Sequence, residues 1–322
     1  MPKTKVKGSE AKLAKYGLFF VLPFIVVYLI FNFWPTLYTI LLSFTDLNGF
    51  QTFGEAEWVG ISNWGSLIKD GNFWGAVGNT FIMWGFNFIP QLGIALIFAV
   101  VFTDPTLTGL RGKNLFRALF YLPNLLTAAS IAILFRSLFA YPVGPINQFF
   151  TKLGIQATVV RDNVEIKEAI QFFRSPAWSR GIVSFIQWWM WCGQTLIMLM
   201  AGITSISPSL YESAVVDGAT QGQQTWYITL PLLRPMMLYL MVTSVIGGMQ
   251  LFEIPFLLTD MRGGPDYKIR TMVLYMYNTA FQGKNRYGYA STIAMGVFII
   301  TIILSFIMSQ ILKDRDAAKK GK

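Results

Sequence analysis

Long apolar runs separated by short polar segments fill most of the chain. An apolar stretch of about 20 residues is long enough to cross a lipid bilayer as a helix. Such stretches predict six spans, at about 16–45, 75–102, 115–140, 181–203, 235–259 and 288–312. Because the bilayer core offers no water to backbone groups, these spans must be helical. The pattern therefore predicts an all-α polytopic membrane protein with six transmembrane helices.

Two of the spans have features that need comment. Pro23 and Pro35 lie in the first span, and each predicts a kink or a non-ideal helix end. The third span has a short uncharged centre at 118–135. Arg117 and Arg136 must therefore extend to opposite interfaces of the bilayer for it to cross.

Polar segments divide the chain into a basic tail at 1–15, one transmembrane domain at 16–312 and a basic tail at 313–322. Within the domain, the polar stretches of most interest are a loop at 205–234 and an insertion at 141–180. A cleaved signal peptide is not expected at the start, because the first apolar run is too long and no small-residue cleavage site follows it.

The insertion carries two short apolar stripes. The first predicts a helix that begins at Pro145 and ends at Gly154, and the second predicts a weaker helix. Such helices either lie on the outer membrane surface or pack on neighbouring loops, and the pattern leaves both possibilities open. The stripes consist of Ile146, Phe149, Phe150 and Leu153, and of Ile166, Ile170 and Phe173.

Composition agrees with a membrane protein and excludes several classes of function. Charged residues make up 13% of the chain, about half the ~25% that is typical of soluble domains. The sequence has no histidine, and its one cysteine, Cys192, lies in an apolar run. Histidine-based metal sites, catalytic triads and intrachain disulfides are therefore excluded.

The charges also predict an orientation. With the N-terminus in the cytoplasm, the cytoplasmic segments 1–15, 103–117, 205–234 and 313–322 contain 5, 3, 1 and 5 lysines and arginines, against six acids in total. Basic cytoplasmic loops are what the positive-inside rule requires. The net charge of +10 is explained by these flanking residues rather than by nucleic-acid binding. Both termini and the 205–234 loop are thus expected in the cytoplasm.

The 205–234 loop is expected to fold as two short helices. Ser207 can cap the first, Pro208 suits its first position, and Gly218 can end it. A second helix fits 221–230, after which two prolines lead into the next span. Two short helices between spans are typical of a docking surface, although an ordinary cytoplasmic hairpin is the alternative.

The same loop carries a recognisable motif. It reads Tyr211-Glu212-Ser213-Ala214-Val215-Val216-Asp217-Gly218-Ala219, followed by Gly222, Trp226 and Ile228-Thr229-Leu230-Pro231. This resembles the E-A-A-x-x-x-D-G-A loop, with an aromatic residue and L-P beyond it, of permease subunits in binding-protein-dependent ABC importers. Ser213 replaces the first alanine of the motif, and Trp226 stands where phenylalanine is usual. In that family the loop is the coupling helix, which docks on a separate ATPase.

The resemblance gives these residues expected roles at the ATPase. Glu212 can pair with an arginine of the partner. Asp217 could do likewise, although capping of the following turn is favoured. The remaining positions are Gly218 and Gly222 for tight backbone geometry, Ala214 and Ala219 for close approach, Trp226 as an anchor at the subunit or membrane interface, and the motif residues Ser213 and Pro231.

The chain contains no G-x-x-x-x-G-K-[ST] loop, so we do not expect it to bind ATP by a P-loop itself. The resemblance then implies a transport subunit and not an enzyme, with no cofactor of its own. ATP and Mg²⁺ would be bound by the partner ATPase.

Polar residues inside the spans are candidates for a translocation path. Gln187, Trp191 and Gln194 lie at i, i+4 and i+7 and so share one helical face, which offers an aromatic ring and amides to a carbohydrate. Hydrogen bonding between helices is the alternative for each. Glu253 is the only acid well inside an apolar run, and such residues default to a functional role. The other candidates are Asn87, Tyr121, Asn124, Ser244, Gly248 and Gln250.

Further motifs indicate a branch of the family. The segments Leu18–Asp46, Phe252–Thr259, Gly263-Gly264-Pro265 and Tyr287–Ser291 resemble sugar-importer permeases of the maltose and lactose type. The resemblance implies a second permease subunit, usually a different chain, an ABC ATPase dimer and an extracytoplasmic sugar-binding protein in a bacterial inner membrane. A stand-alone secondary carrier, a membrane enzyme and a permease for a non-sugar solute such as glycerol phosphate are the alternatives.

Overall fold

The computed structural model describes residues 6–104, 112–161, 164–259, 261–283 and 285–312. The predicted tail at 313–322 and the first five residues of the 1–15 tail lie outside these ranges. The chain divides into two compact units, one formed by Met1–Lys69 with Thr279–Met295 and the other by Asp70–Asn278 with Gly296–Lys322. In the described ranges, five helices, or six if one bent pair is a single span, are long and apolar enough to cross a membrane.

The first span consists of α1 (Val6–Tyr28), a π-helical turn (Leu29–Phe33) and α2 (Trp34–Leu42). We predicted an irregularity at each proline, and the structure has one between them. Pro23 lies inside α1, whereas the π-turn ends directly before α2, whose first turn holds Pro35. Pro35 has no N–H for the carbonyl four residues earlier, so a wider turn at that point accommodates it.

The rest of this unit holds a short 3₁₀ turn (Phe53–Glu55), α3 (Ser62–Lys69) and the beginning of α15 (Tyr287–Leu312). α15 approaches the end of the first span closely. A side chain at Gly288 would overlap the carbonyl of Thr45. One turn later, the Thr292 hydroxyl donates to the carbonyl of Ser43 over 3.0 Å. Small and hydroxyl side chains thus allow α15 to pack against the chain's own first span.

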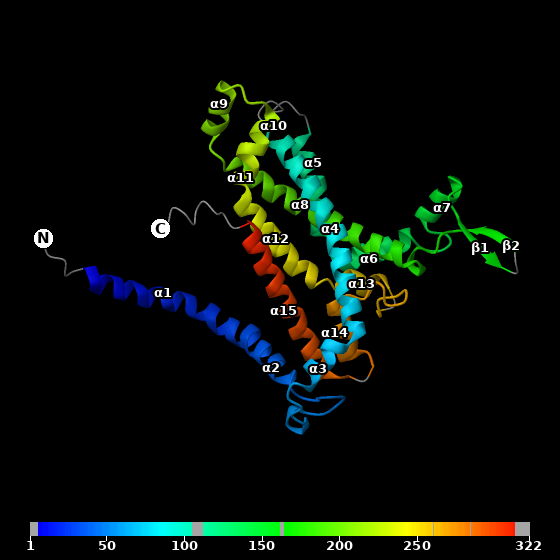
Figure 1. Ribbon diagram of the computed structural model, residues 1–322. Helices are drawn as coiled ribbons and strands as arrows, with labels where there is room; N and C mark the ends of the chain where they lie inside the picture. Colours follow the sequence, from blue (N-terminus) through cyan, green and yellow to red (C-terminus); the bar gives the residue numbers. More distant parts are fainter. Residues whose placement is uncertain (1–5, 105–111, 162–163, 260, 284, 313–322) are drawn as a thin grey trace. The chain divides into compact units, whose positions relative to one another are not determined.

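In the second unit, α4 (Gly71–Thr103) and α8 (Pro176–Thr204) pack along one another, and α12 (Arg234–Met249) packs on both (Figure 1). One apolar cluster of these helices centres on Ala95, Leu196 and Leu199, which are fully buried. A second cluster, around Met83 and Ile186, joins α4 and α8 to α6 (Ala128–Leu138) and α13 (Glu253–Leu258).

The third span is not the single helix that we predicted over 115–140. It consists of α5 (Lys113–Tyr121), a 3₁₀ turn (Leu122–Leu125) and α6, and the two halves meet at a bend of 97°. Two residues explain the break. Pro123 lacks an N–H for the preceding turn, and Thr127 caps α6 by accepting the Ser130 N–H on its hydroxyl over 3.2 Å.

The predicted fifth span at 235–259 is also interrupted. α12 ends at Met249, and α13 begins at Glu253 after a short non-helical segment. Pro255 cannot donate to the carbonyl of Leu251, four residues earlier. The hydroxyl of Thr271 donates to that carbonyl instead, over 2.5 Å. The break is therefore stabilised by a donor from a distant part of the sequence.

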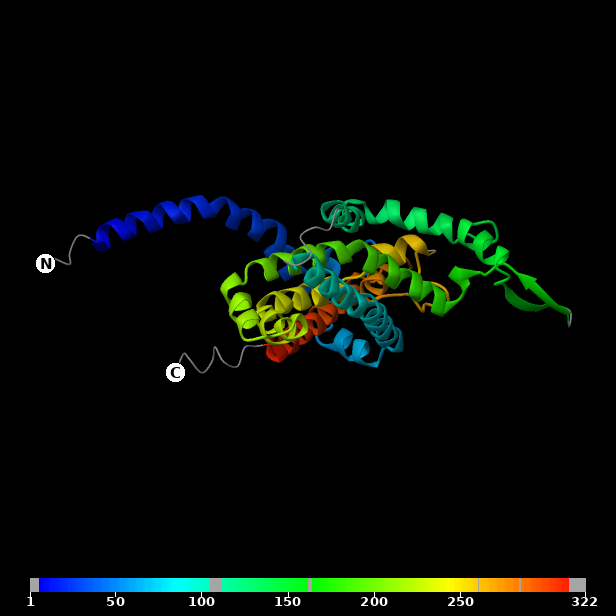
Figure 2. The same cartoon turned by 90° about the horizontal axis from the view of Figure 1, so that it is seen from above.

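The 141–180 insertion matches half of its prediction. The first stripe forms α7 (Pro145–Lys152), which is followed by Gly154 at φ +74°. The predicted second helix is wrong, because β1 (Ala157–Arg161) and β2 (Val164–Glu168) form an antiparallel pair there, followed by a 3₁₀ turn (Phe172–Arg174). The β-branched residues Val164 and Ile166 alternate with polar residues along β2, and this pattern favours a strand over a helix. The pair projects away from the helices of its unit (Figure 2).

The loop after α8 contains α9 (Pro208–Val216), α10 (Gln221–Gln224), a π-helical turn (Thr225–Thr229) and α11 (Leu230–Leu232). Two short helical segments were predicted here, and they are present. Between the last two predicted spans lies a further helix, α14 (Met272–Phe281).

A test of this packing is the change Gly193→Ala at the crossing of α8 with α5. The added methyl group would overlap the carbonyl of Phe120, and such overpacking costs about 1–3 kcal/mol. A lower Tm of the purified protein is therefore expected. Gly181→Ala on the same helix is the control, since no atom lies within 4 Å of that Cβ. Equal Tm values for the two variants would contradict the close crossing.

Candidate functional site

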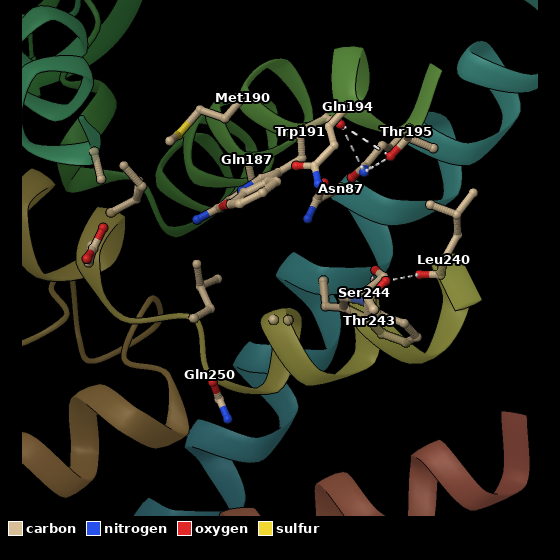
Figure 3. Close-up of a pocket in the computed structure, with 18 of the residues that line it drawn as sticks. Asn87, Gln187, Met190, Trp191, Gln194, Thr195, Leu240, Thr243, Ser244 and Gln250 are labelled. Atoms are coloured by element: carbon tan, nitrogen blue, oxygen red, sulfur yellow. Dashed lines mark hydrogen bonds between the residues drawn. The ribbon is translucent and has the colours of Figure 1, made fainter. Parts of the chain in front are cut away.

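A cavity of about 480 Å³ lies between α4, α8, α12 and the break that precedes α13. Figure 3 shows amide and aromatic side chains of α8 on one side of it and the hydroxyls of Thr243 and Ser244 on α12 across from them. The cavity lies within one compact unit of the chain. Its volume falls within the range of small-molecule sites, about 300–1,000 Å³.

Most of the predicted path residues line this cavity. Those of α8 all face it, which confirms that they share one side of the helix. Tyr121 and Asn124 do not line it, although the Asn124 side-chain amide lies 3.4 Å from the Gln194 carbonyl oxygen. The lining members of the predicted set are Asn87, Gln187, Trp191, Gln194, Ser244, Gly248, Gln250 and Glu253.

Several lining residues hold the helices together. The Gln91 amide donates to the Thr195 hydroxyl over 2.7 Å, which joins α4 to α8. The Trp84 indole N–H donates to the Ser244 hydroxyl over 3.0 Å, which joins α4 to α12. Gly248 lies against the Trp84 indole, so closely that a side chain there would overlap it. These contacts favour a role in helix packing for Ser244 and Gly248, and not a role in the translocation path.

Other lining groups are unpaired. Within the described ranges, the side-chain amides of Gln187 and Gln250 and the carboxylate of Glu253 make no hydrogen bond or ion pair. The Asn87 side-chain oxygen is buried and has no partner among the described residues. An unpaired buried polar atom such as this oxygen is costly and needs an explanation. The four groups line one cavity, where a ligand can pair with them.

Sequence reasoning missed several lining residues. The helical period alone could have identified Met190, Thr195 and Met198. Each lies three or four residues beyond Gln187, Trp191 or Gln194, and therefore on the same face of α8. Trp84, Tyr239 and Phe252 come from other elements, and no local pattern marks them. Only the packing of α4, α12 and the break brings these aromatic residues to the same cavity.

The arrangement can bind a polyhydroxylated solute. Flat apolar rings, such as the half-exposed indole of Trp191, stack on the faces of sugar rings, and neutral amides both donate to and accept from hydroxyls. Among the described residues, no group of acids and cysteine is placed to hold a metal ion.

A loop from Met261 to Thr271 is fixed to the N-terminal parts of α4 and α8. Arg180 donates to the Asn79 side-chain oxygen over 2.6 Å and to the carbonyl of Lys268 over 2.8 Å. Arg270 donates to Asn72 over 2.8 Å and lies over the Tyr267 ring at 4.2 Å. Burial lowers the pKa of the Arg270 guanidinium, and the nearby tyrosines and Asp70 oppose that shift. The same loop carries Thr271, which supports the break before α13.

The segment Ser207–Pro235, here termed the coupling segment, presents a largely exposed surface. No residue of α9 is buried. Val216 is 87% exposed and Trp226 is 71% exposed. Tyr211 ties α9 to the following π-turn through a 2.9 Å hydrogen bond to Thr229. Glu212 is exposed and makes no ion pair with any described residue. A helix pair that is held together by its own hydrogen bond and is exposed at its surface is suited to contact another subunit.

Two expectations for this segment need correction. The carboxylate of Asp217 does not cap the following turn: Thr220 caps α10, in a reciprocal pair with Gln223. Gly218 has φ +77°, which explains a glycine at that position. Gly222 lies inside α10, and a Cβ added there would have no atom within 4 Å. Its lack of a side chain is thus not required by the chain's own packing.

Comparison with known proteins identifies the family. Residues 72–317 match the family model described as "Binding-protein-dependent transport system inner membrane component". The chain belongs to this family. The binding-protein-dependent permeases are multi-pass membrane proteins and transport components without an ATPase site of their own, and their fold is that of type I ABC importer permeases.

Relatives among curated proteins are sugar permeases of the same family. The lactose transport system permease protein LacF of Rhizobium radiobacter is 29% identical over 311 residues, which cover 95% of this chain and 98% of LacF. The multiple sugar-binding transport system permease protein MsmF of Streptococcus mutans is 28% identical, over 94% of this chain and 97% of MsmF.

Solved structures share the fold. A chain of a bacterial ABC transporter involved in the import of the acidic polysaccharide alginate aligns with a TM-score of 0.77 at 23% identity, covering 95% of this chain and 97% of that one. The same transporter in complex with an alginate pentasaccharide-bound periplasmic protein aligns with a TM-score of 0.76 at 22% identity.

The division between paired and unpaired amides predicts two kinds of mutant permease. Gln187→Ala and Gln250→Ala should weaken transport of the solute about fivefold each, the equivalent of about 1 kcal/mol, while leaving Tm unchanged. Gln91→Ala should lower Tm, because it removes the bond to Thr195. Uptake assays and thermal melts of the same preparations check this. A fall in Tm for all three variants would show that the cavity amides are structural.

Proposed function

We propose that this chain is the membrane subunit of an ATP-driven oligosaccharide uptake system and forms half of its translocation path. The observation that carries the proposal is the cavity in which aromatic rings lie beside unpaired neutral amides. Family membership supplies the context of binding-protein-dependent transport, and relatives named for sugars support carbohydrate as the solute class. A non-sugar solute such as glycerol phosphate is the alternative, and it would need cationic groups that the described lining does not contain.

The proposed partners follow from the same argument. A second permease, homologous but distinct, would supply the other half of the path. An ABC ATPase dimer would bind ATP and Mg²⁺, and an extracytoplasmic sugar-binding protein would deliver the solute. The protein would lie in a bacterial inner membrane with both termini and the coupling segment in the cytoplasm, as the basic cytoplasmic segments indicate.

In the proposed mechanism, ATP binding closes the ATPase pair and displaces the docked coupling segment. This displacement switches the cavity from inward-facing to outward-facing, where it receives the solute, and hydrolysis restores the first state. Glu212 pairs with a basic residue of the ATPase, and Trp226 packs in its groove. A stand-alone carrier would need several ionisable groups to couple an ion gradient, and Glu253 alone is a poor proton relay.

The coupling role is tested by combining Glu212→Ala with Gly218→Pro. The first change removes the exposed acid. The second is incompatible with the positive φ at that position. Uptake should be lost, and the ATPase should no longer co-purify, while the permease still reaches the membrane.

The matched control is Glu165→Ala, which removes an acid from the exposed strand β2. It should leave both uptake and co-purification unchanged. Normal uptake by the double variant would remove the coupling segment from its proposed role.

A further inference from the structure

The cavity lining has a single formal charge. Among the described residues that line it, Glu253 is the only acid, and neither lysine nor arginine is present. The other polar groups are neutral amides, hydroxyls and the indole N–H groups of two tryptophans. This half of the path is therefore electrostatically negative, and it contains no cation that could compensate an anionic solute.

The Glu253 carboxylate has no side-chain partner in the described part of the chain, and its one structural contribution is the favourable position of an acid in the first turn of a helix. It begins α13, is exposed, and makes no ion pair or hydrogen bond within the described ranges. Arg180 and Arg270, which fix the outer loop, are bonded to Asn79, to the Lys268 carbonyl and to Asn72. An acid inside an apolar span is costly unless a function requires it. An unpaired acid on a solute cavity points to the solute.

A carboxylate acts in opposite directions on neutral and anionic sugars. It accepts hydrogen bonds from hydroxyl groups, and such charge-assisted bonds are stronger than neutral ones. A carboxylate, sulfonate or phosphate on the solute is repelled, and this repulsion is only partly screened in a partly desolvated cavity. One residue can therefore combine attraction of the intended solute with exclusion of a competitor.

We propose that Glu253 is a specificity-determining residue that makes this half of the path favour neutral oligosaccharides over acidic ones. The proposal rests on the proposed function, since it names the solute class of the same cavity. At a separation of about 10 Å and an effective dielectric constant of about 20, one like charge weakens binding of an anionic saccharide on the order of tenfold.

The experiment uses the purified complex of both permeases and the ATPase in nanodiscs, without the binding protein, so that its own selectivity does not contribute. Saturation-transfer NMR measures the dissociation constants of galactobiose and of digalacturonic acid with the same linkage, at neutral pH and low salt. The wild type should bind galactobiose about tenfold more tightly. Glu253→Gln should bring the two constants close together.

Two further variants make the result specific. Gln250→Glu adds a second acid to the lining and should widen the difference, which tests the proposal even if Glu253→Gln fails to assemble. Glu165→Gln removes an acid on strand β2, outside the cavity. It should leave the ratio of the two constants at the wild-type value.

The outcomes separate this inference from the proposed function. An unchanged ratio in Glu253→Gln, or a wild-type preference for digalacturonic acid, overturns the charge selection and leaves saccharide transport standing. Binding of glycerol phosphate together with no binding of either saccharide overturns the proposed function, and the charge selection with it.

Discussion

The hydrogen bond from the Thr271 hydroxyl to the Leu251 carbonyl is the interaction on which the cavity depends. Pro255 leaves that carbonyl without its helical donor, and in an apolar span an unpaired carbonyl is expensive. Because Thr271 supplies the donor, α12 can stop and α13 can start at a different place in the fold. Gln250 and Glu253 lie at this break, and both line the cavity.

The polar side chains of the site fall into two groups, those that are already hydrogen-bonded to another helix and those that are not. Hydrogen bonds between helices already pair Gln91 with Thr195 and Trp84 with Ser244. These bonds fix how far α8 and α12 stand from α4 and thereby set the width of the cavity. The unpaired groups then face a space whose dimensions are already determined. A preorganised cavity of this kind binds its solute without the cost of ordering its own side chains.

Apolar run length predicted where the spans lie, and cap and glycine signals predicted the two short helical segments between α8 and α12, since both kinds of signal are local. The breaks were missed because each depends on partners that are distant in sequence, as Leu251 and Thr271 illustrate. The strand β2 was mistaken for a helix because Ile166, Ile170 and Phe173 fit a helical period by coincidence. The shared face of Gln187, Trp191 and Gln194 was predictable from the helical period, but the aromatic residues opposite were not.

The chain connects the cavity directly to the coupling segment. α8 lines the cavity and ends at Thr204, and three residues separate it from the start of α9. α12 lines the opposite side and begins at Arg234, within the last two residues of the segment. Any force on the coupling segment therefore acts at once on the ends of both helices. Because their separation is fixed by bonds to α4, the force must either move the three helices together or break those bonds, and a rigid-body movement is the less costly response.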